Sequence, residues 1–245
     1  VGSAVASIFS EDEKVIIDPK FNDNKITDFK GVRFNAVFVA VDTPRDDNFK
    51  LLDSVLAELN ENMPDGTPVC VKSTATPAFY EHAVNKYTNL RVLHSPEYLN
   101  KTDPIGMFTG QKFFIIGGDK EAAEAVALIF TRKLHCVEKF YITDIKTAAL
   151  VKYAENFFLS LRVTFFNEMF LTHKQQGCLS SFDEFTQMLG MDERIGHSHS
   201  KVPGADGKMG WSSHCLDKDA AALEQFSSSP LVSFIRTLND AHREL

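Results

Sequence analysis

The sequence predicts an α/β fold in which a Rossmann-like, doubly wound parallel sheet is followed by an all-helical domain. Two observations lead to this prediction. Over the first 140 residues, short apolar runs alternate with amphipathic helical patterns. Apolar strands separated by helices are typical of parallel sheets that are covered on both faces. Beyond that point the patterns are helical only, so we expect domains at 1–140 and 141–245.

The composition of the 245-residue chain is that of an ordinary globular protein, with 44% hydrophobic and 24% charged residues. Its net charge of −7 argues against a nucleic-acid partner, because neutralising phosphates requires a basic surface. Since no apolar stretch is long enough to span a bilayer, we expect no membrane partner. The four cysteines lack paired spacing, which is typical of free thiols in a reducing cytoplasm, where we expect the protein.

Five apolar runs are predicted to be strands: 14–18, 35–44, 68–74, 91–99 and 112–118. Ligands of doubly wound sheets bind beyond the carboxyl ends of the strands. Thr43 and Pro44 close the second run and are therefore candidate cofactor-binding residues. Between the strands, the pattern at 49–63 places Leu52, Val55, Leu56 and Leu59 on one helical face, and Asp119 is the expected N-cap of a helix over 119–134.

The N-terminal residues resemble part of a dinucleotide-binding unit. A helix is entered through Gly2, and the run 14–18 ends in Asp18. In such a unit, a strand and a glycine-rich loop precede the helix, and an acidic residue binds the ribose hydroxyls. Gly2 and Asp18 therefore predict NAD as the cofactor. The first strand and two glycines are absent, so we expect either an N-terminally clipped chain or a natural variant with an altered loop.

The second half begins with a long helical pattern over 144–177, on which Lys152 and Asn156 share one face. A lysine near a substrate can stabilise an oxyanion, although a solvated lysine is the commoner case. We expect this helix and the terminal one at 230–245 to form a homodimer interface. A short helix at 181–190 and a glycine-rich loop at 191–211 lie between them; the loop either covers a ligand or is disordered.

Cys215 has a histidine on one side and an acid–lysine–acid run on the other, shortly after a glycine turn. Structural cysteines usually occur in apolar runs, where they pack as small hydrophobes. The polar surroundings therefore make Cys215 a candidate reactive thiol. Lys152 and Lys218 are candidate neighbours that would stabilise its thiolate.

Four stretches together resemble the UDP-glucose/GDP-mannose dehydrogenase family of nucleotide-sugar dehydrogenases: "VKSTATP" at 71–77, "HSPEYL" at 94–99, "VKYAENFFLSLRVTFFNEM" at 151–169 and "CLDKD" at 215–219. The resemblance covers nearly the whole chain, and the last two stretches are the most specific. It implies that NAD oxidises the C6 alcohol of a nucleotide sugar twice, to a carboxylate. UDP-glucose to UDP-glucuronate is the expected conversion.

The resemblance also implies a role for each matching residue. Cys215 would capture the aldehyde as a thiohemiacetal, which the second oxidation converts to a thioester. Lys152 and Asn156 would stabilise the oxyanions, with Asp219 bonded to them, while Glu97 would be the base for hydrolysis and Thr74 would orient water. Lys218 would lie near the cofactor, and Arg194 would reach the substrate of a neighbouring subunit. The other substrate-binding candidates are Tyr98, Leu99 and Gly210.

The chain departs from the family pattern around the cysteine. Ser212 and Ser213 replace two glycines, His214 replaces a small residue, and Asp217 stands where proline is usual. The sequence also ends where the family's third domain would begin. These departures leave two alternatives open: a single-step dehydrogenase that needs no cysteine, or a truncated, impaired homologue that acts as a binding or assembly module.

A metal site is a further alternative, formed by His197, His199, His214 and Cys215. Their spacing fits no common zinc pattern, so we expect a loop with unrelated histidines and no metal.

Overall fold

The computed structural model describes residues 1–43, 49–99, 102–212 and 214–245, except for the side chain of residue 214. The chain divides into two compact units, residues 1–152 and residues 153–245. One long helix, α6 (Ile145–Gln175), runs through the boundary. The domains expected at 1–140 and 141–245 remain a prediction.

The first unit contains a five-stranded sheet, counted over the described residues, with its strands in chain order. The strands are β1 (Val37–Val39), β2 (Thr67–Val71), β3 (Leu90–His94), β4 (Phe113–Gly117) and β5 (Lys139–Thr143). Neighbours are parallel except for β3 and β4, which pair antiparallel through His94 and Gly117 alone. The predicted α/β fold class is confirmed, with the difference that the sheet is mixed.

Glycine allows the end of β4 to come close to its neighbours. A Cβ atom on Gly117 would lie 2.5 Å from the Ala148 Cβ, and one on Gly118 would lie 2.9 Å from the Val92 carbonyl oxygen. Gly118 also has a φ of 134°, which L side chains rarely adopt. The pair of glycines is therefore a requirement of this junction between β3, β4 and α6.

The strand predicted at 14–18 is wrong, because these residues form neither a strand nor a helix. Val15 and Ile17 are 44% and 43% exposed, so the apolar run does not enter the sheet. The strand β5 was not predicted from the sequence. Since Lys139 and Tyr141 are exposed, β5 lacks the continuous apolar character expected of a buried parallel strand.

The helices of the first unit are α1 (Gly2–Ala6), α2 (Lys50–Asn62), α3 (Pro77–Lys86), α4 (Pro104–Thr109) and α5 (Lys120–Lys133), with a 3₁₀ turn at Ile26–Phe29. Asp119 caps α5 as predicted, accepting from the Ala122 N–H. Helices α3 and α4 were not predicted from the sequence. Both begin with a proline, and Thr76 and Asp103 cap them, so the start signals were present in the sequence.

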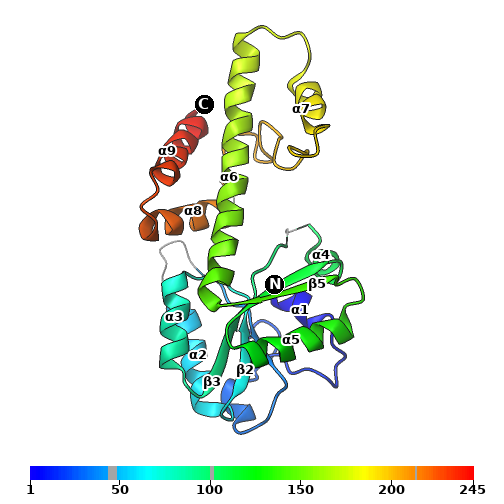
Figure 1. Cartoon of the computed structure of the whole chain (residues 1–245), viewed down its shortest axis with the longest axis vertical. Helices are drawn as coiled ribbons and strands as arrows, with labels where there is room; N and C mark the ends of the chain where they lie inside the picture. The colour runs from blue at the N-terminus through cyan, green and yellow to red at the C-terminus, as the bar shows by residue number, and fades with distance from the viewer. Residues whose placement is uncertain (44–48, 100–101, 213) are drawn as a thin grey trace. The chain divides into compact units, whose positions relative to one another are not determined.

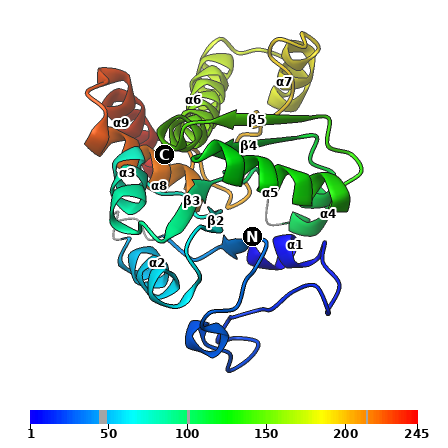
Figure 2. The ribbon, with the colours of Figure 1, turned by 60° about the horizontal axis from the view of Figure 1, so that its bottom comes forward.

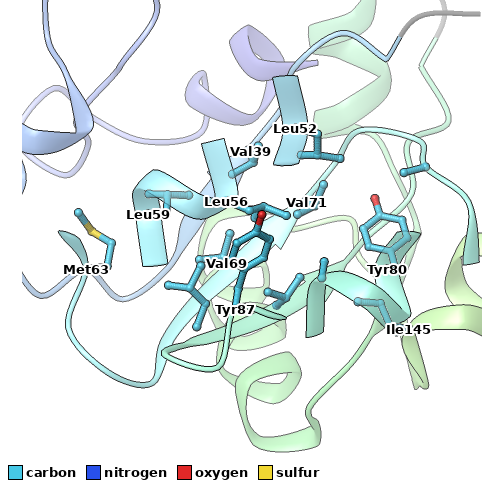
Figure 3. Close-up of a cluster of buried hydrophobic side chains, with 14 of the residues drawn as sticks. Val39, Leu52, Leu56, Leu59, Met63, Val69, Val71, Tyr80, Tyr87 and Ile145 are labelled. Carbon is cyan, nitrogen blue, oxygen red and sulfur yellow. The ribbon is translucent and has the colours of Figure 1, made fainter. Parts of the chain in front are cut away.

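The helices cover both faces of the sheet (Figures 1 and 2), and each face buries its own core. Val69 and Val71 of β2 pack with Leu52 and Leu56 of α2 in the first core (Figure 3). Cys70, between those two valines, packs instead in the second core, which α1, α4 and α5 cover. Alternate residues of a strand point to opposite faces, so this assignment follows from the strand itself.

The second unit is helical. The rest of α6 packs against α7 (Phe182–Gly190) through Phe166 and Phe182. Trp211, Leu216 and Ile235 join α8 (His214–Phe226) and α9 (Pro230–Glu244) in another cluster with α6. The helix expected over 144–177 is confirmed in α6. Among the described residues, no helix has the length and apolar character needed to cross a membrane.

We expect Leu56→Ala to lower the free energy of unfolding by about 2–5 kcal/mol, because Leu56 is completely buried and alanine leaves a cavity. Leu51→Ala is the matched control on the same helix, since Leu51 is 51% exposed. Denaturant unfolding of the two variants measures the difference. Equal losses of stability would contradict the core described here.

Candidate functional site

The carboxyl ends of β2 and β3 carry a buried cluster of polar residues in the first unit. The ammonium group of Lys72, directly after β2, forms an ion pair with the Glu97 carboxylate and donates to the Ser95 hydroxyl at 2.8 Å. The Lys72 side chain is completely buried, and the Glu97 side chain is 8% exposed. Glu97 was predicted from the sequence, whereas Lys72 and Ser95 were not. A lysine that continues an apolar strand is the signal that could have identified Lys72.

His94, the last residue of β3, is buried in its neutral form. Its Nδ1 lies 3.0 Å from the Val71 carbonyl oxygen and 2.8 Å from the Tyr80 hydroxyl, which itself donates to the Ser73 carbonyl. Since a carbonyl only accepts, we place the ring proton on Nδ1. Burial lowers the pKa of His94 to about 3, and the nearby Lys72 and Lys152 act in the same direction. His94 Nε2 is left buried without a hydrogen-bond partner among the described residues.

Other candidates of the first unit lie on the loops that follow the strands. Thr74 is half-buried after β2, and Thr43 is buried after β1. Tyr98 and Leu99 are half-buried after Glu97. The Lys152 ammonium lies 5.1 Å from the centre of the Tyr98 ring, over its face. A cation above an aromatic face is attracted by the ring quadrupole.

The N-terminal candidates for NAD differ from the expected geometry. Gly2 begins α1, and a Cβ there would only touch the Ala40 Cβ at 3.6 Å. Asp18 lies in a turn, where one carboxylate oxygen, Oδ1, accepts from the Lys20 N–H at 2.9 Å. It does not close a strand, because the strand predicted before it does not form. Pro44 lies outside the described residues.

In the second unit, a buried network joins α6 to α8. The Asn156 amide donates to one oxygen of Asp219, and the Lys218 ammonium donates to the other, both at 2.5 Å. All three side chains are less than a tenth exposed. A buried carboxylate needs such partners, since an unpaired charge is costly away from water. The predicted neighbours Asn156 and Asp219 are thus in direct contact, and Lys218 is the counter-ion of Asp219.

Cys215 is exposed and belongs to the first turn of α8, which begins at residue 214. The cysteine therefore lies on a helix and not on a loop. Cys70 is completely buried in β2, Cys136 is half-buried and Cys178 is exposed. The two exposed thiols, Cys215 and Cys178, are therefore the accessible ones.

The residues before Cys215 are fixed by buried amides. Gly210 donates its N–H to Asn167 at 3.0 Å, and the Asn239 side chain bonds both the N–H and the carbonyl of Trp211. Gly210 has a φ of 74°, and a Cβ there would lie 2.7 Å from the Asn239 Oδ1. The fold itself therefore requires glycine at this candidate substrate-binding position.

Arg194 and the loop around it form hydrogen bonds of their own, apart from those of Gly210 and Trp211. The Arg194 guanidinium bonds the Asp192 carboxylate, at 2.6 Å for the shortest contact, and its side chain is 90% exposed. Arg162 of α6, which the sequence analysis missed, donates to the carbonyls of Ile195, Gly196 and Ser198. Arg162 and Arg194 also line an open cavity of about 330 Å³, together with Phe158, Leu161, Phe165, Phe166 and Ile195.

The structure gives no support to the metal alternative. His197 and His199 are exposed, and the side chain of His214 is not described. Within the described part of the chain, no three histidine, cysteine, aspartate or glutamate side chains gather closely enough to hold a metal ion.

Comparisons with known proteins agree with the motif analysis. Residues 146–241 match the model of the UDP-glucose/GDP-mannose dehydrogenase family, central domain. The chain is 28% identical to the putative UDP-glucose 6-dehydrogenase YtcA of Bacillus subtilis, over 84% of this chain and 50% of the relative. It is 26% identical to the UDP-glucose 6-dehydrogenase of Rickettsia felis, over 77% of this chain and 42% of the relative. The chain spans about half the length of the curated relatives it matches.

Two solved structures share the fold. A UDP-glucose dehydrogenase of Pyrobaculum islandicum superposes with a TM-score of 0.72 at 24% identity, over 84% of this chain and 50% of that one. A UDP-D-ManNAc dehydrogenase of Pyrococcus horikoshii superposes with a TM-score of 0.76 at 21% identity, over 98% of this chain and 61% of that one. The resemblance to the nucleotide-sugar dehydrogenase family is confirmed.

The neutral, buried His94 predicts a pH dependence of stability. Its pKa is about 3 in the folded protein and keeps its ordinary value of 6.5 when unfolded. Between these values the unfolded state binds more protons, so acidification favours unfolding. We expect the free energy of unfolding to fall as the pH decreases from 6.5 towards 3, and to fall less steeply in His94→Gln.

Denaturant unfolding at a series of pH values measures this slope. His82→Gln is the control, because His82 is an exposed histidine on α3. A His94→Gln variant with the wild-type slope would show that His94 does not titrate in this window.

Proposed function

We propose that this chain, a relative of the UDP-glucose/GDP-mannose dehydrogenases, carries the NAD-binding and catalytic parts of a nucleotide-sugar 6-dehydrogenase. One observation carries the proposal. The buried Asn156–Asp219–Lys218 network ties α6, the helix of Lys152, to α8, the helix of Cys215. A buried ionic network costs desolvation and is weak evidence for stability alone, so a function in positioning the first turn of α8, which carries Cys215, is the better explanation.

NAD is the cofactor that we propose. The second carboxylate oxygen of Asp18 has no hydrogen-bond partner among the described residues and could accept from a ribose hydroxyl. Gly2 has no neighbour that demands a glycine, which is compatible with a ligand close to its backbone. Thr43 lies at the carboxyl end of β1, where doubly wound sheets bind ligands, and we retain Pro44 and Lys218 as further contacts. When bound, NAD supplies the acceptor for two hydrides.

The chemistry of Cys215 explains why a thiol is needed. Loss of a hydride and a proton from the C6 alcohol leaves an aldehyde. The Cys215 sulfur bonds to the aldehyde carbon and retains it as a thiohemiacetal. Loss of the second hydride and the hydroxyl proton gives a thioester, whose C–S bond breaks when water attacks. The thiolate leaves, and the product is a carboxylate. Lys152 and Asn156 would stabilise the negative oxygen at each stage.

Glu97 is the base that we propose for the hydrolysis. Its carboxylate would take a proton from the attacking water, which Thr74 would orient. Burial of Glu97 supports this role, because water held against a desolvated carboxylate is a better nucleophile than bulk water.

UDP-glucose is the substrate that we propose, with Arg194, Gly210, Tyr98 and Leu99 as its contacts. The exposed Arg194 side chain supports a contact with a substrate bound by a second copy of the chain. The open cavity beside it supports a homodimer, because Phe158 and Phe165 on α6 remain 58% and 48% exposed. The four free thiols support a location in the reducing cytoplasm.

Turnover and thiol labelling test the proposal together. We expect the chain, or a longer form that includes it, to reduce two NAD per UDP-glucose, and Cys215→Ser to abolish carboxylate formation. Cys178→Ser is the matched control, since Cys178 is the other exposed thiol. UDP-glucose should slow the alkylation of Cys215 by iodoacetamide and leave that of Cys178 unchanged.

The alternatives give different results. A single-step dehydrogenase would reduce one NAD and tolerate Cys215→Ser. A binding or assembly module would bind the nucleotide sugar without forming NADH.

A charged substitution on the exposed face of α6 tests the homodimer. We expect light scattering to give twice the chain mass for the wild type and the monomer mass for Phe158→Glu, because a buried carboxylate would oppose association. Leu128→Glu is the control on α5, where Leu128 is 50% exposed. A monomeric wild type, or a dimeric Phe158→Glu variant, would contradict the interface.

A further inference from the structure

Lys72 is a buried cation with an unusual environment. Its ammonium lies 6.0, 5.7 and 5.7 Å from the ring centres of Phe108, Phe114 and Phe130. These rings stabilise the charge through their faces but offer no hydrogen-bond acceptor comparable with water. The Ser95 hydroxyl and the Glu97 carboxylate supply the polar contacts of the ammonium.

The other titratable groups near Lys72 do not neutralise it. Burial raises the pKa of the Cys70 thiol to about 11, so Cys70 on β2 is uncharged at neutral pH. His94 on β3 is also neutral there, and Lys152 on α6 is itself a cation. Burial lowers the pKa of Lys72 to about 8. A carboxylate at contact distance favours the charged form of an ammonium group. Glu97 is therefore the anion that balances Lys72.

The pairing leaves one oxygen of Glu97 available. Oε1 faces the Lys72 ammonium, whereas Oε2 is buried without a hydrogen-bond partner among the described residues. A buried, unpartnered carboxylate oxygen is costly unless something donates to it. A water molecule that gives up a proton is such a donor.

We propose that Lys72 is the positioning residue of Glu97: with Ser95, it holds the carboxylate ionised and oriented so that Oε2 can accept a proton from water. This inference rests on the proposed role of Glu97 as the base for thioester hydrolysis. Lys72 itself transfers no proton and contacts no substrate. Without its counter-ion, the carboxylate would bind a proton more readily and would lose its fixed orientation.

The first experiment tests the pair without any reaction. In protein labelled with ¹³C-lysine, the Lys72 signal is identified by its absence from Lys72→Met and followed with pH. In Glu97→Gln, burial of the ammonium is no longer opposed, so we expect its titration midpoint to fall by about one pH unit or more. An unchanged midpoint would overturn the pairing.

The second experiment separates the two oxidations from the hydrolysis of the thioester. We expect Lys72→Met to form both NADH of the first turnover normally, but to hydrolyse the thioester at least about tenfold more slowly at neutral pH, so that mass spectrometry detects an adduct on Cys215. The defect should diminish as the pH rises, because alkali restores the carboxylate. Ser95→Ala should shift the pH profile in the same direction by a smaller amount.

Controls distinguish positioning from damage to the fold. Lys86→Met removes an exposed lysine that pairs with Asp53 at 2.9 Å, and it should leave both the oxidations and the hydrolysis unchanged. If Lys72→Met does not fold, Ser95→Ala still tests the proposal, because it keeps both charges. A wild-type pH profile for hydrolysis in Ser95→Ala and in any folded Lys72→Met would overturn it.

The same measurements separate this inference from the proposed function. If the wild-type enzyme forms no NADH from nucleotide sugars, the proposed function fails and the role of Lys72 in hydrolysis fails with it. The lysine titration then decides the ion pair alone. If the wild type is active and both variants hydrolyse the thioester normally, the function stands and the inference is wrong.

Discussion

The alternation of side chains along β2 is the constraint on which the candidate site depends. Val69 and Val71 fill one core of the sheet, so Cys70 must face the other. Lys72 continues the strand and falls on the same side as Cys70, among three phenylalanine rings. A cation placed there must be neutralised, and Glu97, in the loop after β3, supplies the charge. The polar cluster is thus a consequence of a sheet covered on both faces.

In the second unit, a buried charge is likewise balanced by its neighbours, here on helices. Asp219 faces inward on α8, and both of its oxygens are bonded, one by Asn156 of α6 and one by its neighbour Lys218. These contacts fix the first turns of α8, including the exposed Cys215. The amides of Asn167 and Asn239 fix the preceding backbone at Gly210 and Trp211. The exposed thiol of Cys215 therefore stands on a well-supported helix start.

The elements with strong local sequence signals were the predictable ones. The helix at 144–177 and the cap at Asp119 were predictable, because periodicity and capping act within a few residues. The run 14–18 was wrongly predicted to be a strand. A strand forms only where a neighbouring strand pairs with it, and the apolar pattern of the run does not specify such a neighbour. The opposite error occurred at β5, a strand that was not predicted. Its residues Lys139 and Tyr141 are exposed and interrupt the apolar pattern, yet the strand forms because it pairs with β4.

The sequence alone determined the fold class, the long helix and the candidate residue types: a cysteine with polar neighbours, a lysine and an asparagine one turn apart, and an acid after a strand. Only the tertiary structure decided which of these residues meet. It joined Asn156 to Asp219, paired Lys72 with Glu97, and placed Cys215 on a helix. Such pairings depend on how strands and helices distant in the chain pack together, and the partner of a buried charge is set by that packing, which no local pattern encodes.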